Sequence, residues 1–422
     1  KESLKTKVDS IMHSSIRLNA FPGAQIVVLK DGEEILNKSY GYHTYDSLIP
    51  VSKDDLYDLA SLTKVLASSL AIMKLYEIYD LKLEDPVSKW IPFLKRGNKK
   101  KHTFKQILSH SAGWVPYISH QNLVFNNRGG FKRNTLSRYK SKRFPYMVND
   151  SLFVHKSYQK KIFSRIRKSK LNTFGEVVYS GMFYFFIPRL VQTLSGLSFS
   201  AFLENHFYDP MQLDRITFMP TLNFKKNELI PTERDSVFRK QLVHGWVHDE
   251  AASMMGGVSG NAGLFANANS IAPILKMLLQ KGSYNGIEFL KPETIELFTQ
   301  RAYPDGLNPR GLIFDKPTLD LEDENRYPSI LVSPSSFGHT GFTGTMIWVD
   351  PKNLGYKPFY ERWLRNRYGN GIKVDSEDEQ KSTLFDVYSN LYEKYVPKSI
   401  DLILKGIVDG EMGEKLIQVI PI

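Results

Sequence analysis

The sequence predicts an α+β fold, in which an antiparallel β-sheet flanked by helices is joined to a mostly helical second lobe. Two apolar runs in residues 23–43 surround Asp31-Gly32, a dipeptide typical of a tight β-hairpin. A second pair of strand-like runs lies far along the chain, in residues 336–351. Because the pattern between them is mainly helical, strands from both ends can form one sheet and the middle a separate lobe.

The helices are predicted from apolar residues that recur at helical spacing. The longest, residues 61–81, contains no Gly or Pro. In the helix at 183–196, Gly196 is expected to be the C-cap. Further helical segments are expected at 3–18, within 103–114 and in the later part of 254–282.

Composition sets limits on the class of protein. The chain has 422 residues, 42% of them hydrophobic, which is enough for a large core. No stretch approaches the roughly 18 consecutive apolar residues of a membrane span, and we expect no signal peptide in this chain. The chain has no cysteine, which excludes disulfides, thiolate catalysis and cysteine zinc sites.

The positive charge is concentrated in one region, residues 95–170, which we call the basic segment. It contains 20 Lys or Arg against one acid, Asp150, in a chain of net charge +12. Such a run is typical of a solvated surface, so we expect this stretch to lie on the surface and not inside a core. It is also compatible with binding of an anionic polymer, acidic lipid or nucleic acid. No known nucleic-acid module accompanies it, so we expect no specific nucleic-acid partner.

Residues 58–67, DLASLTKVLA, contain the pattern Ser-x-x-Lys at Ser61 and Lys64. One helical turn separates the two residues, so their side chains can meet. The pattern alone is weak, because a serine at a helix start is also a good N-cap, and the pattern recurs at 137–140 and 157–160. The first copy continues into a strongly apolar run, where a buried amine can act as a base for the serine.

Two later motifs contain further candidates. Tyr179-Ser180 lies between an extended apolar pair and a helix, in VVYSGMF. His339-Thr340-Gly341 lies on a predicted strand in FGHTGFTG, where glycine allows backbone or ligand to approach closely. Taken alone, the tyrosine is compatible with a core or turn position and the histidine with an ordinary strand position.

Together, Ser-x-x-Lys, Tyr-Ser-x and His-Thr-Gly resemble the motifs of the serine β-lactamase and penicillin-binding protein superfamily. The resemblance is to the branch of class C β-lactamases, DD-peptidases and esterases, and most of all to the serine-hydrolase domain of Bacteroidetes glycosidase fusions. It covers about residues 1–351. The supporting stretches are YDLASLTKVLA (57–67), ILSHSAGW (107–114), VHDEAASMMGGVSGNAGLF (247–265) and GHTGFTGTMIWVDP (338–351).

The resemblance implies acyl-enzyme chemistry on a D-alanyl peptide, β-lactam or ester, without metal or cofactor. Ser61 would be the nucleophile, and Lys64 would take or relay its proton. Tyr179 would hydrogen-bond both the nucleophile and the leaving group, serving as base or acid. His339, where many relatives have lysine, would recognise a substrate carboxylate or assist proton transfer. The backbone N–H groups of Ser61 and Phe342 would form the oxyanion hole, and Ser180, Thr340 and Gly341 would contact the substrate.

The resemblance also implies a domain organisation and a location. The hydrolase domain would span 1–351, with a sheet lobe at about 1–60 and 260–351 and a helical lobe at about 61–259. The basic segment would be an insertion in the helical lobe, and 352–422 has no assigned role. The substrate would be a small molecule or peptidoglycan-like, and the location the periplasm or cell envelope of a bacterium.

Three departures from the family pattern are expected to matter. Gly181 stands where class C relatives have asparagine, and the third motif begins with histidine, as in DD-peptidases and esterases. After IWVDPKN the sequence is not strand-like. The sheet therefore either lacks an edge strand or receives one from a distant segment such as 416–422.

Two alternatives stay open. The first is that the chain is a catalytically inert penicillin-recognising fold that binds cell-wall or other anionic polymer. Chemically competent residues at all three motif positions favour an enzyme over this alternative. His244 and His248, beside Asp249 and Glu250, would be able to contact one metal if they lay on a helix.

Overall fold

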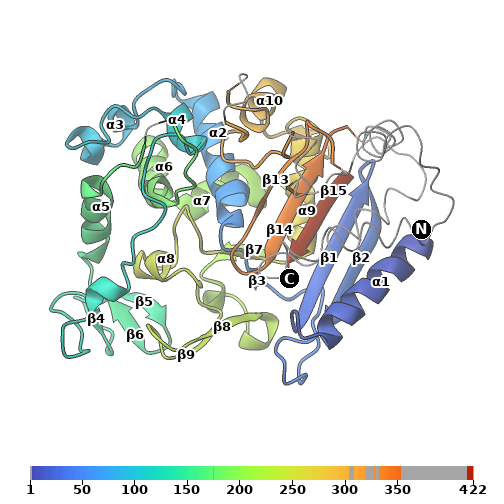
Figure 1. The fold of residues 1–422 in the computed structure, drawn as a ribbon, viewed down its shortest axis with the longest axis horizontal. Helices are drawn as coiled ribbons and strands as arrows, with labels where there is room; N and C mark the ends of the chain where they lie inside the picture. Colours follow the sequence, from blue (N-terminus) through green and yellow to red (C-terminus); the bar gives the residue numbers. More distant parts are fainter. Residues whose placement is uncertain are drawn as a thin grey trace, which may run out of the picture.

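A five-stranded antiparallel sheet with the order β13-β14-β15-β1-β2 organises the fold (Figure 1). The structure is a computed structural model that describes residues 2–173, 175–303, 308–319, 327–328, 332–352 and 416–421. The two predicted strand pairs are confirmed, as β1 (Gly23–Lys30) with β2 (Glu33–Gly41), and β13 (Phe337–Thr340) with β14 (Thr345–Asp350). In the first hairpin, Asp31 and Gly32 both have positive φ, as a tight turn between twisted strands requires.

The fifth strand, β15 (Leu416–Pro421), comes from the end of the chain. It lies between β14 and β1, where Val419 pairs with Val27 on one side and with Ile347 on the other. A distant segment therefore completes the sheet, which was one of the two alternatives. It does so as an internal strand and not at the edge.

Both faces of the sheet are covered by helices. α1 (Glu2–Arg17), the predicted amphipathic helix, packs its apolar side chains on one face together with Ile26 and Val28 of β1. On the other face, α9 (Ala268–Leu279) contacts β1, β14 and β15, and Val27 and Leu29 join the main core. Successive side chains of β1 point to opposite faces of the sheet, so this one strand contributes to both hydrophobic cores.

The helical lobe occupies the other half of the molecule (Figure 1). Its helices are α2 (Ser69–Ile78), α3 (Val87–Trp90), α4 (Phe104–Leu108), α5 (Tyr158–Lys168), α6 (Ile187–Ser195), α7 (Phe199–Leu203) and α8 (Glu250–Met254), with α10 (Pro292–Thr299) against α2. Two small antiparallel sheets have three strands each, in the orders β3 (Tyr57–Asp58), β10 (Leu264–Ala266), β7 (Ile216–Phe218) and β4 (Leu136–Ser137), β6 (Leu152–Val154), β5 (Tyr146–Asn149). Two more have two strands each, β8 (Pro231–Asp235) with β9 (Gln241–His244), and β11 (Ser283–Tyr284) with β12 (Ile287–Glu288). None of the described helices has the length and apolarity that crossing a bilayer requires.

The predicted helices differ from the observed ones mainly at their ends. The segment predicted as one helix over 61–81 starts with a π-helical stretch, Lys64–Ser68, which runs into α2. The helix expected within 103–114 is a single short one, α4, that begins with a capping box of Thr103 and Gln106. Gly196 ends α6 with φ of 77°, as predicted for its C-cap.

The expectation that the basic segment lies wholly outside the core is wrong. Ile162 and Ile166 of α5 are fully buried in the main core. Lys99 is also fully buried. Its amine is stabilised there by two contacts, since Nζ donates to Ser169 O at 2.7 Å and lies 5.4 Å from the Trp114 ring centroid. Burial lowers the pKa of this lysine to about 8.

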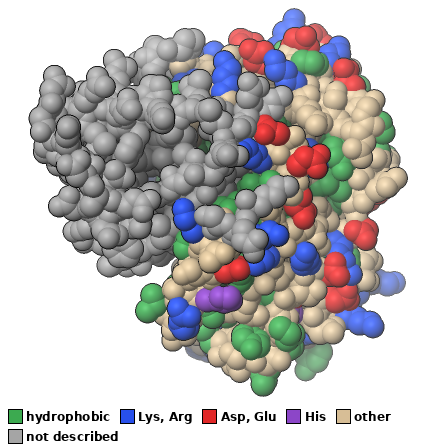
Figure 2. Space-filling model, turned by 90° about the vertical axis from the view of Figure 1, so that its right-hand side faces the viewer, with side chains coloured by type: hydrophobic (Ala, Val, Ile, Leu, Met, Phe, Trp, Pro, Cys, Tyr) green, Lys and Arg blue, Asp and Glu red, His purple; other side chains and the backbone are tan. Residues whose placement is uncertain are grey.

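Most other cations of the basic segment are exposed. The elements α5 and β4–β6, which carry many of them, lie at the end of the helical lobe away from the main sheet (Figure 1). On the opposite side of the molecule, which carries α1, acidic and basic side chains are interspersed over the described surface (Figure 2). The charge asymmetry seen in the sequence is therefore also an asymmetry between the two ends of the molecule.

Candidate active site

Ser61 and Lys64 meet as the sequence pattern predicted. Lys64 Nζ is 2.8 Å from Ser61 Oγ and donates to Asn261 O at 3.1 Å. The lysine is only 2% exposed, whereas Ser61 is partly exposed. The π-helical stretch starts at Lys64, and such departures from α-helical geometry are frequent at functional sites.

The turn that presents Ser61 is fixed by Asp58 at the end of β3. Its carboxylate accepts hydrogen bonds from Ala60 N at 2.8 Å and from His248 N at 2.5 Å. Ala60 has φ of 44°, a left-handed conformation that is rare for alanine, so the turn before Ser61 is strained. Burial raises the pKa of Asp58, and the two backbone hydrogen bonds oppose that rise.

Tyr179 lies beside Lys64, with its ring centroid 5.2 Å from Lys64 Nζ. The side chain is 39% exposed. Within the described part of the chain, its hydroxyl forms no hydrogen bond, so the direct contact with Ser61 that we expected is not present in this conformation. The aromatic ring instead packs between two histidines, His110 at 4.7 Å and His339 at 5.8 Å between centroids.

His110 holds the backbone on both sides of Tyr179. Val178 N donates to His110 O at 2.9 Å, and Ser180 N donates to His110 Nδ1 at 3.0 Å. Burial, reinforced by the nearby Arg310 and Lys64 cations, holds the pKa of His110 well below its ordinary value. The ring is therefore neutral, with its proton on Nε2, because Nδ1 accepts the bond from Ser180.

His339 lies on β13 and is 2% exposed. Its Nδ1 is 2.6 Å from Thr340 O. Burial lowers its pKa to about 4, although the nearby Asp315 carboxylate acts in the opposite direction.

Asp315 and Arg310 form an ion pair close to both histidines. Tyr327 Oη also donates to Asp315 Oδ2 at 3.0 Å. Burial disfavours the ionised carboxylate, but Arg310, His339 and Tyr327 together hold the pKa of Asp315 below its usual range. The Arg310 guanidinium lies 5.5 Å from the Tyr179 ring centroid, so this pair borders the same tyrosine.

The turn between β13 and β14 closely approaches the residues that precede Ser61. A Cβ atom at Gly341 would lie 2.5 Å from Leu59 O, so this position requires glycine. Neither Ser61 N nor Phe342 N donates to an acceptor among the described residues, so both remain available as donors. The Phe342 side chain is 78% exposed, and its ring stacks 5.3 Å from that of His248.

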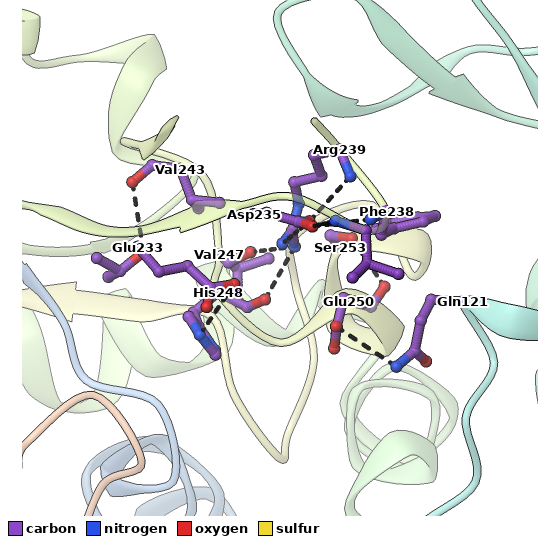
Figure 3. A network of polar contacts seen from close by, with 12 residues as sticks. Gln121, Glu233, Asp235, Phe238, Arg239, Val243, Val247, His248, Glu250 and Ser253 are labelled. Carbon is purple, nitrogen blue, oxygen red and sulfur yellow. Dashed lines mark hydrogen bonds and ion pairs between the residues drawn. The ribbon is translucent and has the colours of Figure 1, made fainter. Parts of the chain in front are cut away.

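The loop that carries His248 is held by a buried polar network (Figure 3). Arg239 donates to Val247 O at 2.7 Å and to His248 O at 2.9 Å, and it pairs with Asp235 at 3.4 Å. The network thereby holds the backbone that carries the His248 ring, and this ring contacts Phe342 and lies 3.3 Å from a carboxylate oxygen of Glu233.

The metal alternative does not match this geometry. His244 lies at the end of β9, not on a helix, and its Nε2 contacts the carbonyl oxygens of Lys226 and Leu229. His248 instead contacts Glu233 and Phe342. Within the described ranges, no group of three or more His, Cys, Asp or Glu is arranged to hold a metal ion.

Two predicted substrate contacts are engaged within the protein. The Ser180 hydroxyl donates to Val115 O at 2.7 Å, and the Thr340 side chain hydrogen-bonds the Tyr327 side chain while its backbone carbonyl accepts from His339. Substrate binding by Ser180, Thr340 and Gly341 stays a prediction. At Gly181, the departure from class C relatives, a Cβ would fit without a clash, in ordinary van der Waals contact with Asn261 Cβ at 3.8 Å and Lys64 Cε at 4.0 Å.

Sequence reasoning gave no role to His110, Asn261, Arg310 or Asp315. His110 lies in the quoted stretch ILSHSAGW, but its φ of 60° and its contact with Tyr179 have no signal in the pattern. Asn261 acts through its backbone carbonyl, which any residue would supply.

Comparisons with known proteins bear on the family and the fold. The family model described as Beta-lactamase matches residues 9–372. A protein of Salmonella agona (strain SL483) named "Putative D-alanyl-D-alanine carboxypeptidase" is 28% identical over 376 residues, which cover 80% of this chain and 79% of that protein.

Solved structures share the fold at low sequence identity. A penicillin-binding protein homologue from Caulobacter crescentus has a TM-score of 0.58 and 16% identity, over 83% of this chain and 89% of that one. EstCE1, a hydrolase with promiscuous acyltransferase activity, has a TM-score of 0.59 and 17% identity, over 83% of this chain and 91% of that one. The predicted α+β, β-lactamase/transpeptidase-like fold is therefore confirmed.

Proposed function

The chain belongs to the beta-lactamase family, and on that premise we propose that it is an active serine hydrolase that forms an acyl-enzyme on Ser61. The observation that carries the proposal is the contact of Ser61 Oγ with the buried Lys64 Nζ at 2.8 Å. A nucleophilic serine needs a neighbouring base, and hydrogen-bond distance is the first requirement for proton transfer.

In the proposed reaction, Ser61 Oγ attacks the substrate carbonyl carbon while its proton passes to the Lys64 amine. The proton then reaches the leaving group, with Tyr179 as the relay on the exposed side of the site. The oxyanion is held by the N–H groups of Ser61 and Phe342, and each such donor contributes about 3 kcal/mol to lowering the barrier. Water attacks the acyl-enzyme in a second step and releases the acid and free Ser61.

The substrate class follows from the relatives. One is named "Putative D-alanyl-D-alanine carboxypeptidase", and one structural neighbour is EstCE1, a hydrolase with promiscuous acyltransferase activity. We therefore propose a small ester or a D-alanyl peptide of peptidoglycan type as substrate, and a periplasmic or cell-envelope location.

We propose a second, separate role for the basic segment, which is binding of an anionic polymer. Burial and the charges of Arg143, Lys161 and Lys156 together lower the pKa of His155, three residues before α5. None of these three cations pairs with a described carboxylate. Because α5 lies away from the main sheet, this surface would anchor the protein and not contact the reacting bond. Retention on immobilised heparin, released by salt and lost in a variant with all three cations replaced by Gln, tests it.

Intact mass after incubation with a fluorophosphonate or a penicillin tests the enzymatic proposal. An active hydrolase gains one adduct, which peptide mapping places on Ser61. An inert penicillin-recognising fold that only binds polymer gives no adduct with either probe and no ester hydrolysis.

A further inference from the structure

The hydrogen-bond state of His339 decides what this side of the site can recognise. Nδ1 lies 2.6 Å from Thr340 O, and a carbonyl oxygen can only accept, so Nδ1 carries a hydrogen. The neutral ring then has a bare lone pair on Nε2. This atom is buried and has no hydrogen-bond partner among the described residues.

Burial and the nearby cations keep the His339 ring neutral near pH 7. Burial has the largest influence and, with Arg310 and Lys64, lowers its pKa to about 4, against the opposing effect of Asp315. The other groups nearby are the neutral His110 and the phenols of Tyr179 and Tyr327. Arg310 does not offer a free positive charge, because Asp315 pairs with it.

The hydroxyl groups of the motif threonine and of the adjacent turn are also used within the protein. The Thr340 side chain hydrogen-bonds the Tyr327 side chain. Thr343 Oγ1 donates to Asp58 O at 2.6 Å, and Thr345 Oγ1 donates to Leu59 O at 3.1 Å. A substrate carboxylate placed against β13 would therefore meet a lone pair in place of the cation and free hydroxyl donors that would stabilise it.

We propose that His339 acts as a hydrogen-bond acceptor that selects substrates with a neutral N–H or O–H donor beside the scissile bond, and disfavours those with a carboxylate there. The inference rests on the proposed acyl-enzyme function, and of the two proposed substrate classes it favours the small ester over a D-alanyl peptide that ends in a carboxylate. It separates the two expected roles of His339, because carboxylate recognition requires a cation at Nε2 and the observed geometry provides an acceptor.

The test uses two esters that differ at one group, N-acetyl-D-alanyl-D-lactate and its lactamide. At pH 7.5 we expect kcat/KM for the carboxamide to exceed that for the carboxylate by about tenfold or more, as when a buried polar group loses its partner. Protonation supplies an N–H at Nε2. The ratio of kcat/KM for the carboxamide to that for the carboxylate should therefore fall as the pH is lowered to 5.

Variants separate this selectivity from general effects on folding. His339→Lys should shift the ratio toward the carboxylate, whereas His13→Lys, the same change at an exposed position of α1, should leave it unchanged. A wild-type preference for the carboxylate at pH 7.5, with both esters hydrolysed, overturns the selectivity and leaves the hydrolase intact. Absence of hydrolysis and of any Ser61 adduct overturns both proposals. If His339→Lys does not fold, the wild-type ratio of kcat/KM for the two esters and its pH dependence still test the proposed selectivity.

Discussion

The His110 ring packs 4.7 Å from the Tyr179 ring, and His110 also holds the backbone of residues 178 and 180 on either side of that tyrosine. One buried residue thus fixes both the position of the ring and the path of the chain that carries it. Tyr179 has no hydrogen bond of its own within the described residues, so its placement near Lys64 depends on these contacts. We conclude that His110 is a positioning residue for Tyr179.

His110→Ala should lower kcat by about 10- to 100-fold with a small change in KM, because small displacements of a catalytic group are costly. His110→Asn is the matched control. Its Oδ1 can replace Nδ1 as acceptor for Ser180 N, and asparagine tolerates the left-handed φ of 60° found here. We expect Asn to recover most of the activity. Equal losses in the two variants, at equal thermal stability, would contradict the positioning role.

Ser61→Ala should abolish both acylation and ester hydrolysis, with a loss of about 10⁴-fold or more, as for other catalytic serines. The fold should persist, since the partly exposed hydroxyl makes one contact, with Lys64. Ser137→Ala and Ser157→Ala are the controls from the other two Ser-x-x-Lys patterns. Ser157 contacts His155 and Ser137 contacts Tyr139, so neither should change the rate. Retained adduct formation in the Ser61 variant would refute the assignment.

Lys64→Met should reduce kcat by roughly 10²- to 10⁴-fold, the usual range for loss of a general base. Methionine fills a similar volume, so circular dichroism and melting temperature should show a folded protein. Lys99→Met is the control at another buried lysine, whose contacts are with Ser169 O and the Trp114 ring. It should change stability and leave kcat within about twofold. A similar kcat loss in both variants would indicate a packing effect in place of a catalytic one.

The elements set by local pattern were predictable from sequence, and those set by distant contacts were not. The hairpin at Asp31-Gly32 and the Gly196 cap depend on residues next to each other, so their turn chemistry is readable. β15 is a short apolar run whose internal place depends on pairing with both β1 and β14. Nothing in the order of its residues distinguishes an internal strand from an edge strand.

The same distinction applies to the site. Ser61 and Lys64 are one turn apart, and local spacing was enough to predict that they meet. Tyr179 was recognised by its motif, but its supports come from His110, nearly seventy positions earlier, and from Arg310 far downstream. Lys99 shows the opposite failure. Its charge predicted exposure, yet a carbonyl and an aromatic ring make burial possible.

Buried neutral histidines should make the protein lose stability in mild acid. Burial, helped by Arg165, lowers the pKa of His120 to about 4 from the ordinary 6.5. As the pH falls below 6.5, the unfolded chain binds this proton first, so the free energy of unfolding decreases down to about pH 4. One such histidine contributes up to about 3 kcal/mol over this range.

His120→Gln should therefore flatten the decline of unfolding free energy between pH 6.5 and pH 4.5, measured by urea titration at each pH. His13→Gln, at an exposed position, should leave the slope unchanged. His110 and His339 act in the same direction, so some slope will persist in the variant. An identical slope in wild type and His120→Gln would show that this residue does not titrate as its burial implies.

The internal position of β15 makes the sheet dependent on the last strand of the chain. Val419→Pro should destabilise the protein by about 3 kcal/mol or more, because proline cannot donate a ladder hydrogen bond and is tolerated in strands only at edges or bulges. Val419→Thr, which keeps both the N–H and the β-branch, is the matched control and should cost much less. Chemical denaturation measures both. Since β15 joins the β13–β14 pair to the β1–β2 hairpin, the proline variant should also lose acylation of Ser61 as the β13–β14 turn loses its support. A proline variant as stable and as reactive as wild type would show that β15 does not occupy this place in the sheet.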